Sequence, residues 1–216
     1  MKNVGALHDN LDHKAYLILK QMITDRKLQP GEKIRQEKLA RELGISRTPL
    51  VNALKYLEKE KLVEAKPRRG FYVRLFNDSE MISIFELREV LEGLAARRTA
   101  MQITDRELRK LRRFFSQFSD SGAITDVRGY SREDREFHNY ITTLGSKEFL
   151  KSVLDTFNVI SFSYQFSSSE GLVRDPGETI GEHRAIIQAI SDRDPQAAEQ
   201  LMRAHFQKSI EAIRCR

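Results

Sequence analysis

Cysteine and tryptophan are nearly absent from this chain of 216 residues, which has one cysteine, Cys215, and no tryptophan. A single cysteine can form neither an internal disulfide nor a thiolate zinc site, so a disulfide scaffold and a cysteine-type zinc finger are excluded. No run of about 18 apolar residues occurs, and the first ten residues lack the apolar core of a signal peptide. We therefore expect a cytoplasmic protein that does not span a membrane.

The charge is unevenly distributed along the chain. A hydrophobic fraction of 40% is enough for a buried core and excludes disorder throughout. Residues 1–76 contain 17 Lys and Arg against 9 Asp and Glu, whereas residues 77–216 contain 20 against 22. The whole basic excess therefore lies in the first third. This asymmetry predicts a first domain over 1–76 that meets a polyanion and a second over 77–216 with another task.

Residue patterning predicts three helices and a hairpin in the first domain. Apolar residues at helical spacing indicate helices over 11–25, 36–43 and 46–59, and the Ser46 hydroxyl is expected to cap the third. Short apolar segments at 62–65 and 70–73 flank a basic tip with Pro67 and Gly70, which predicts a β-hairpin. We expect residues 75–79 to form a linker, with Asn77 among the residues able to cap the following helix.

The second domain is expected to be wholly helical. Breaks at Gly, Pro and capping residues predict helices over 79–102, 104–119, 130–145, 147–167, 177–192 and 195–213. The fold class is therefore mainly α, with an N-terminal winged helix-turn-helix followed by an all-α antiparallel helical bundle.

The segment from Gln36 to Leu54 has the spacing of a helix-turn-helix. Ala40 and Gly44 allow two helices to cross closely, and the second helix then exposes its first turn to DNA. An arginine there can bind guanine, whereas a lone surface arginine is usually only solvated. The agreement of turn spacing, wing and charge favours DNA contact. The predicted DNA-binding residues are Arg35, Ser46, Arg47, Thr48, Lys55, Arg68, Arg69 and Gly70, with Arg35 and Lys55 equally compatible with solvated surface charges.

These residues resemble a known family. The run from Pro30 to Ala40 (PGEKIRQEKLA), the run from Leu43 to Leu50 (LGISRTPL) and the wing are similar to the winged helix-turn-helix of GntR-family transcriptional regulators. The resemblance covers about residues 11–74. One departure is present, because the family usually has Arg then Glu where this chain has Val51 and Asn52. A customary DNA-contacting arginine is missing, so the operator sequence or affinity is expected to differ.

Four residues of the second domain are candidate metal ligands. Asp134 and His138 are four residues apart on one expected helix, and His183 and His205 lie on the last two helices beside apolar residues. Imidazole and carboxylate suit divalent transition metals. A single histidine beside phenylalanine is more often a hydrogen-bonded core residue, so both interpretations stay open from the spacing alone.

The same residues resemble the ligand-binding FCD domain of the FadR subfamily. The similarity rests on the Asp134 to His138 spacing, on Glu182-His183, on His205 and on the segment 87–97 (LREVLEGLAAR). It implies a divalent metal, zinc first with nickel as the alternative, held by Asp134, His138, His183 and His205. It also implies that Arg88 binds the carboxylate of a small organic-acid or sugar-acid effector, although an ion pair with Glu92 one turn away explains Arg88 equally well.

Aromatic residues cluster on the expected helices. Packing in the core or at a dimer face explains them better than a role in lining a pocket. These residues are Phe114, Phe115, Phe118, Phe157, Phe162, Tyr164 and Phe166. Ser161 and Gln165 are candidate polar lining groups.

The leading hypothesis is a ligand-responsive transcription factor, a repressor, that binds operator DNA as a homodimer and is not an enzyme. The alternative is a metal-dependent hydrolase or isomerase with a DNA-binding appendage, for which Glu136 and Glu182 are the nearby candidate bases. A purely structural metal in a constitutive repressor is a third interpretation.

Overall fold

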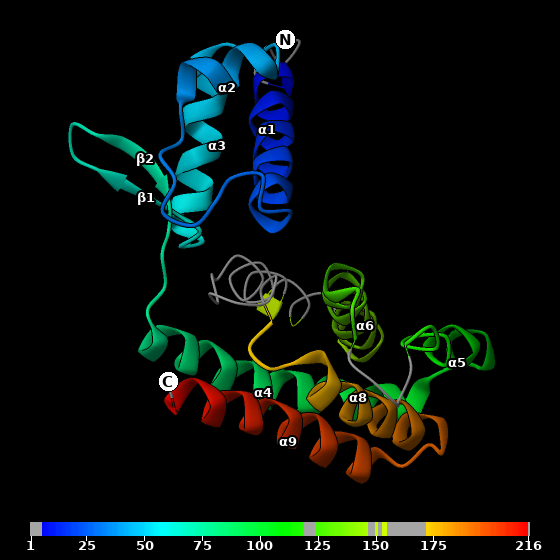
Figure 1. The fold of residues 1–216 in the computed structure, drawn as a ribbon. Coiled ribbons are helices and arrows are strands. Elements are labelled where there is room, and N and C mark those ends of the chain that lie inside the picture. Colours follow the sequence, from blue (N-terminus) through cyan, green and yellow to red (C-terminus); the bar gives the residue numbers. More distant parts are fainter. Residues whose placement is uncertain (1–5, 119–123, 147–149, 151–152, 155–171, 216) are drawn as a thin grey trace. The chain divides into compact units, whose positions relative to one another are not determined.

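The computed structural model describes residues 6–118, 124–146, 150, 153–154 and 172–215, with side chains from residue 11 onward. Contacts divide the chain into two compact units, the first comprising Met1–Leu75 and the second starting at Phe76. The first unit contains helices and a small sheet, and the described elements of the second are all helical (Figure 1). The fold is mainly α, as predicted.

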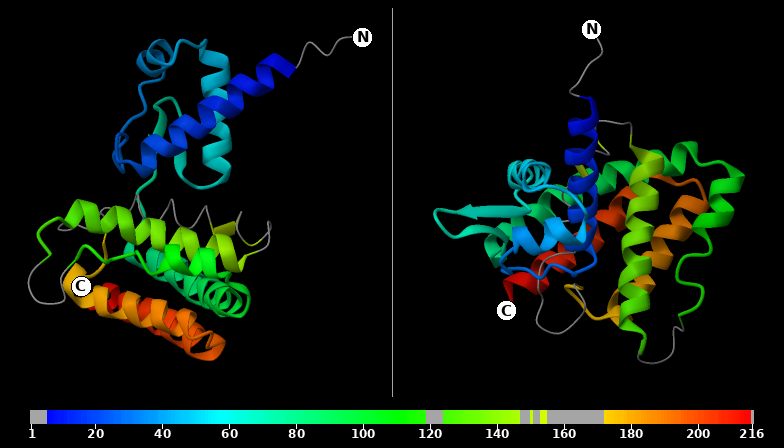
Figure 2. Two further views of the ribbon diagram at one scale, coloured as in Figure 1. Left: turned by 90° about the vertical axis from the view of Figure 1, so that its right-hand side faces the viewer. Right: turned by 90° about the horizontal axis from the view of Figure 1, so that it is seen from above.

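The first unit is a three-helix domain with a hairpin wing. Its elements are α1 (Ala6–Thr24), α2 (Gln36–Glu42), α3 (Arg47–Lys59), β1 (Val63–Lys66) and β2 (Gly70–Val73). The two strands pair in antiparallel register from Val63 opposite Val73 to Lys66 opposite Gly70. The hairpin projects beside the helices (Figures 1 and 2). These bounds agree closely with the predicted helices and strands.

The core of this unit lies between α1 and α3. Leu19 and Ile23 on α1 and Leu50 and Leu54 on α3 are completely buried, because each pair occupies one face of its helix at a spacing of four residues. At the edge of this core Lys20 forms an ion pair of 2.8 Å with Glu60, directly after α3. The packing fixes the helix that carries the predicted DNA-reading residues.

The second unit contains α4 (Asp78–Gln102), α5 (Asp105–Leu111), α6 (Val127–Gly145), α8 (Pro176–Ser191) and α9 (Pro195–Arg214). The longest helices, α4 and α9, lie side by side and run in opposite directions (Figure 1). In Figures 1 and 2, α4 lies between α6 and α9, and it packs against both. The predicted helix over 147–167 lies mostly outside the described residues.

Capping residues set the starts of these helices. Asn77 begins α4 with a reciprocal capping box to Glu80, and Thr104 does the same for α5 with Glu107. Asp175 and Asp194 cap α8 and α9, each followed by a proline at the first helical position. The sequence breaks predicted at these positions are therefore real helix starts.

The prediction of a helix over 104–119 was wrong in its second half, because α5 ends at Leu111. Phe115 has a left-handed backbone with φ of 61°. Its amide donates to Glu133 at 2.5 Å, and Arg184 donates to the carbonyls of Phe115 and Phe118. Side chains of α6 and α8 thus satisfy backbone groups that a continuing helix would have used.

None of the helices in the described part of the chain is both long and apolar enough to cross a membrane.

Candidate DNA interface and metal centre

The turn between α2 and α3 has the predicted helix-turn-helix geometry. Gly44 adopts φ of 64°, a conformation that residues with a Cβ rarely adopt, and the amide of Ile45 donates to the carbonyl of Ala40 at 3.0 Å. Ala40 is buried at the crossing. Ser46 occupies the N-cap position of α3, but its side chain makes no capping hydrogen bond, so that detail of the prediction was wrong. The serine hydroxyl is exposed instead.

Five of the eight predicted DNA-binding residues surround one open hollow of about 600 Å³ in the first unit: Arg35, Arg47, Arg68, Arg69 and Gly70. At the wing tip Arg68 and Gly70 have φ of 60° and 92°, which turns the chain between β1 and β2. Ser46, directly before α3, and Thr48 and Lys55, on α3, are exposed but are not among the residues that line the hollow.

Three further cations line the same hollow and were not singled out from the sequence. Lys33 precedes α2, and Lys38 and Arg41 lie on its exposed face. One acidic residue, Glu37, is also among the lining residues. The local excess of positive charge was the available signal, but only the fold places these side chains beside the wing.

The departure at positions 51 and 52 has a structural counterpart. The Asn52 amide donates to the Asp12 carboxylate of α1 at 2.9 Å, and Val51 is half-buried. Neither residue adds a cation to the exposed face of α3. The cations of α3 are therefore Arg47, Lys55 and Lys59.

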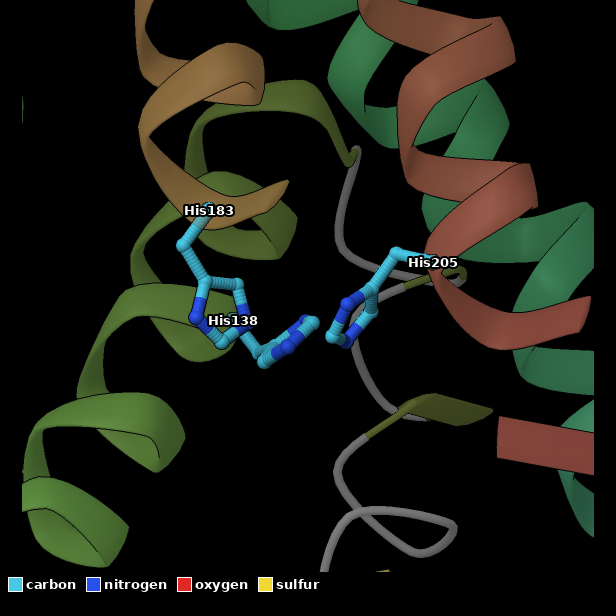
Figure 3. A group of neighbouring side chains, drawn as sticks. All are labelled: His138, His183 and His205. Carbon is cyan, nitrogen blue, oxygen red and sulfur yellow. The ribbon is translucent and has the colours of Figure 1, made fainter. Parts of the chain in front are cut away.

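Three histidines from three helices meet inside the second unit. One ring nitrogen each of His138 (α6), His183 (α8) and His205 (α9) lie within 4.8 Å of one another (Figure 3). Their exposed fractions are 2%, 0% and 6%. Burial lowers the pKa of His183 well below its ordinary value and also lowers that of His205, which keeps both imidazoles neutral as metal ligation requires.

The fourth predicted ligand, Asp134, lies beside this group. One carboxylate oxygen of Asp134 is 3.3 Å from Nε2 of His183 and 3.9 Å from Nε2 of His138. Nε2 of His183 is buried and has no hydrogen-bond partner among the described residues. The structure thus brings the four predicted ligands together and leaves one buried ring nitrogen with an unused lone pair or proton.

The other ring nitrogen of each histidine has a partner that sequence reasoning had not assigned to this role. Nδ1 of His138 lies 2.6 Å from Glu92, and Nδ1 of His205 lies 2.8 Å from Glu182. Nδ1 of His183 lies 3.0 Å from the Tyr130 hydroxyl. No sequence signal identified Tyr130, which lies at the start of the amphipathic helix predicted over 130–145.

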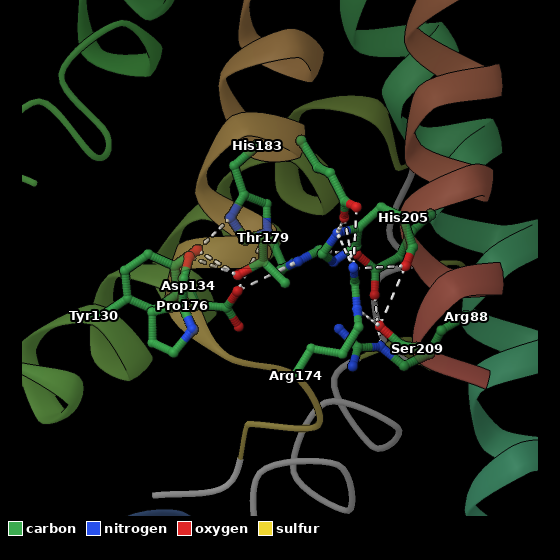
Figure 4. Close-up of polar contacts among 12 residues, drawn as sticks. Arg88, Tyr130, Asp134, Arg174, Pro176, Thr179, His183, His205 and Ser209 are labelled. Atoms are coloured by element: carbon green, nitrogen blue, oxygen red, sulfur yellow. Dashed lines mark hydrogen bonds and ion pairs between the residues drawn. The ribbon is translucent and has the colours of Figure 1, made fainter. Parts of the chain in front are cut away.

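Arg88 and Arg174 form ion pairs with the carboxylates of Glu92 and Glu182. Nε of Arg88 lies 2.7 Å from Glu92, so the ion pair weighed from the sequence is present. Burial raises the pKa of Glu92, but the Arg88 charge and His138 outweigh it and hold the pKa at about 2. Arg174 binds both oxygens of Glu182 through Nη1 and Nη2 at 3.0 and 2.5 Å (Figure 4). Sequence reasoning missed Arg174.

A small cavity of about 40 Å³ opens beside the histidines, and both arginines line it (Figure 4). Its apolar walls are Phe85, Leu172 and Phe206. Its polar side consists of the two arginines, two hydroxyl residues and three of the candidate ligands: Thr179, Ser209, Asp134, His138 and His205. Arg88 therefore reaches the cavity while it is paired with Glu92.

The described aromatic residues near the site pack against one another, and Phe115 is part of the core. Phe115 is fully buried and stacks on His183 with ring centroids 4.6 Å apart and planes 7° from parallel. Phe114 and Phe118 contact neighbouring rings of the same group. The predictions for Phe157, Phe162, Tyr164, Phe166, Ser161 and Gln165 fall outside the described residues.

A winged helix-turn-helix joined to a helical domain is the architecture of a DNA-binding regulator with a separate sensing domain. The sequence matches the bacterial regulatory proteins of the gntR family over residues 11–73 and the FCD domain over residues 83–208. The chain belongs to the GntR family of transcriptional regulators and has an FCD domain, in agreement with the resemblance to the FadR subfamily.

Similar proteins are regulators as well. The HTH-type transcriptional regulator YdhC of Bacillus subtilis (strain 168) is 29% identical over 203 residues, which cover 92% of this chain and 89% of the relative. The Nta operon transcriptional regulator of Aminobacter aminovorans is 30% identical over 187 residues, covering 86% of each chain. A solved GntR regulator from Rhodococcus sp. RHA1 superposes with a TM-score of 0.74 at 18% identity, covering 94% of this chain and 97% of that one.

The chain is thus a DNA-binding transcriptional regulator and not an enzyme, because its family and relatives are regulators. The alternative of a hydrolase or isomerase is overturned by this membership.

Proposed function

We propose that this regulator is a ligand-responsive repressor that binds operator DNA as a homodimer in the cytoplasm, and that its FCD domain holds a divalent metal and a small organic acid. The observation that carries the metal part is the convergence of three buried histidines and Asp134 around one unpartnered ring nitrogen. A repressing role is supported by analogy with the probable D-xylose utilisation operon repressor of Paenarthrobacter nicotinovorans, 25% identical over 187 residues.

The DNA-binding residues are proposed from the hollow between α2, α3 and the wing. Arg47 lies in the exposed first turn of α3, where its fork can bind the O6 and N7 atoms of guanine. Arg68 and Arg69 at the wing tip are placed for phosphate or the minor groove. Selection of bound fragments from genomic DNA, repeated with Arg47→Ala, tests this assignment. Unchanged fragment selection by the variant would contradict the role of Arg47.

The metal is proposed to be zinc, with nickel as the alternative. Three neutral imidazoles and one carboxylate form a donor set that suits zinc and leaves coordination positions for a further ligand. When bound, the ion would supply positive charge and a Lewis-acidic position for an anion. Metal content of the purified protein, followed by chelation and refilling with zinc or nickel, tests the proposal; His183→Ala is expected to abolish stoichiometric binding.

An anionic effector is supported by the charges around the cavity. Arg88, Arg174 and Lys208 together balance the charges of Glu92, Glu182 and Asp134. A divalent ion would raise the net charge of this set from 0 to +2, so the metal favours binding of an acid. The small cavity favours a small carboxylate or sugar acid over a bulky ligand. The third interpretation, a purely structural metal in a constitutive repressor, predicts instead that the protein does not respond to small molecules.

A homodimer is proposed because operator recognition by small winged helices usually needs two reading heads. Exposed apolar residues on α4 support it: Leu87 and Val90, three residues apart, are 48% and 53% exposed, and Met101, three helical turns after Val90, is 66% exposed. Sedimentation equilibrium should give twice the chain mass of 25.1 kDa. Leu87→Glu should then shift the protein toward the monomer, and a monomeric parent would contradict the proposal.

A further inference from the structure

We infer that three hydrogen-bond chains fix all three imidazoles of the metal centre as the Nδ1–H tautomer, so that each turns an Nε2 lone pair toward the centre. Glu92, Glu182 and Tyr130 are then positioning residues of the site. The functional consequence rests on the proposed metal, whereas the tautomers follow from hydrogen-bond directions in the protein alone.

Two of the chains end on carboxylates. Glu92 is paired with Arg88, and Glu182 is paired with Arg174 and with Lys208, whose Nζ lies 2.9 Å away. An ionised carboxylate can only accept hydrogen bonds. The imidazole nitrogen at each contact must therefore be the donor, which places the proton on Nδ1 of the histidine that it contacts.

The Arg174 fork also lies near His205, and its direction supports the same tautomer. Its Nη2 is 3.3 Å from Nδ1 of His205 but donates to the backbone carbonyl of that residue at 3.2 Å. The Nε atom donates to Ser209 at 3.2 Å. Both N–H groups of Nη2 thus have an oxygen acceptor, Glu182 and the carbonyl of His205, so Nδ1 of His205 need not accept from Arg174 and donates its proton to the carboxylate of Glu182 at 2.8 Å.

The third chain ends on backbone carbonyls. The Thr179 hydroxyl lies 3.3 Å from the carbonyl of Pro176 and 3.4 Å from that of Asp175 (Figure 4). A carbonyl only accepts, so threonine donates its one proton there and accepts from the Tyr130 hydroxyl at 2.7 Å. Tyrosine, having donated to Thr179, accepts from Nδ1 of His183 at 3.0 Å.

The three chains converge on one result. Nδ1 of each imidazole is protonated and held, and Nε2 of His183 is buried without a hydrogen bond to any residue that the structure describes. Partners of this kind fix ligand orientation, and their loss typically weakens metal binding by about 10–100-fold.

Tyr130→Phe and Glu182→Gln test the two kinds of chain. Both variants are expected to raise the dissociation constant for zinc by about 10–100-fold, measured against a competing chelator. The matched controls are Tyr140→Phe on α6, whose hydroxyl donates to a carbonyl of Glu107, and Glu178→Gln, exposed on α8. Zinc affinities of Tyr130→Phe and Glu182→Gln equal to those of their controls would overturn the inference.

A second measurement needs no variant and no metal. Long-range ¹H–¹⁵N correlation spectra of the metal-free protein at about pH 8 report which nitrogen of each neutral imidazole is protonated. The expected result is Nδ1–H for His138, His183 and His205. Protonation of Nε2 in any of them would overturn the inference for that chain. If the tautomers are as expected and the parent binds no metal, the proposed metal fails while the hydrogen-bond assignment stands.

Discussion

Replacing Gly145 with alanine should destabilise the helical domain and disturb the histidine centre together. Gly145 ends α6 where this helix crosses α4. A Cβ at this position would lie 1.9 Å from the carbonyl oxygen of Ala95 and 2.6 Å from its carbonyl carbon. Both atoms belong to the backbone of α4, so no flexible side chain can move aside, and α6 must shift.

The stability that overpacking removes is expected to exceed the stability that alanine adds through its higher helix propensity. Overpacking of this kind costs about 1–3 kcal/mol, and a backbone contact belongs at the upper end. Replacing glycine with alanine within a helix stabilises the helix by at most about 1 kcal/mol. We therefore expect the free energy of unfolding to fall by about 2 kcal/mol. The shift also separates Glu92 on α4 from His138 on α6, which now lie 2.6 Å apart.

The assay is urea unfolding followed by far-ultraviolet circular dichroism, with Gly181→Ala as the control. Gly181 is exposed on α8, and no heavy atom lies within 4 Å of an added Cβ. That variant should gain roughly 0.5–1 kcal/mol, because alanine loses less entropy in a helix. Equal stability of the two variants, or a stabilised Gly145→Ala, would refute the close crossing of α4 and α6.

Three further predictions concern the DNA interface and the buried carboxylate. Arg47→Ala should weaken operator binding by about 1–3 kcal/mol and relax the preference at one base pair, measured by fluorescence anisotropy on matched operators; equal losses on all sequences would assign this arginine to phosphate. Replacing Lys38 and Arg41 together with alanine should lower the slope of log affinity against log salt by about 2 with the sequence preference retained, and an unchanged slope would remove them from the interface. Because the folded-state pKa of Glu92 is about 2 against an ordinary 4.5, its contribution to stability is present above about pH 4.5 and is lost as the pH falls toward 2; urea unfolding across this range should show the loss in the parent, and an equal loss in Glu92→Gln would contradict it.

The elements of the DNA-binding domain could be predicted because local signals determine them. Gly44 and the hairpin turn residues mark the positions where a helix or strand ends and the backbone takes a positive φ. The buried faces of α1 and α3 repeat at helical spacing. The end of α5 could not be predicted. Its backbone groups near Phe115 are satisfied by Glu133 and Arg184, which come from other helices and leave no local pattern.

The proposed metal centre shows the same division. The spacing of Asp134 and His138 on one helix and the places of His183 and His205 beside apolar residues on the last two helices were readable, and the resemblance to FCD domains favoured a metal over hydrogen-bonded core histidines. The partners Tyr130 and Arg174 were not readable, because a tyrosine in an amphipathic helix and an arginine before a helix have no distinctive pattern until the helices pack.

The central claim is that an anion binds this regulator through a metal in the helical domain. Thermal unfolding against a panel of small carboxylates and sugar acids, before and after chelation, tests it most directly. A ligand at 100 times its dissociation constant should add about 2.7 kcal/mol of stability. The account predicts that one class of acid raises the melting temperature and that chelation abolishes this effect. A melting temperature that responds neither to chelation nor to any acid would contradict the metal-anchored pocket.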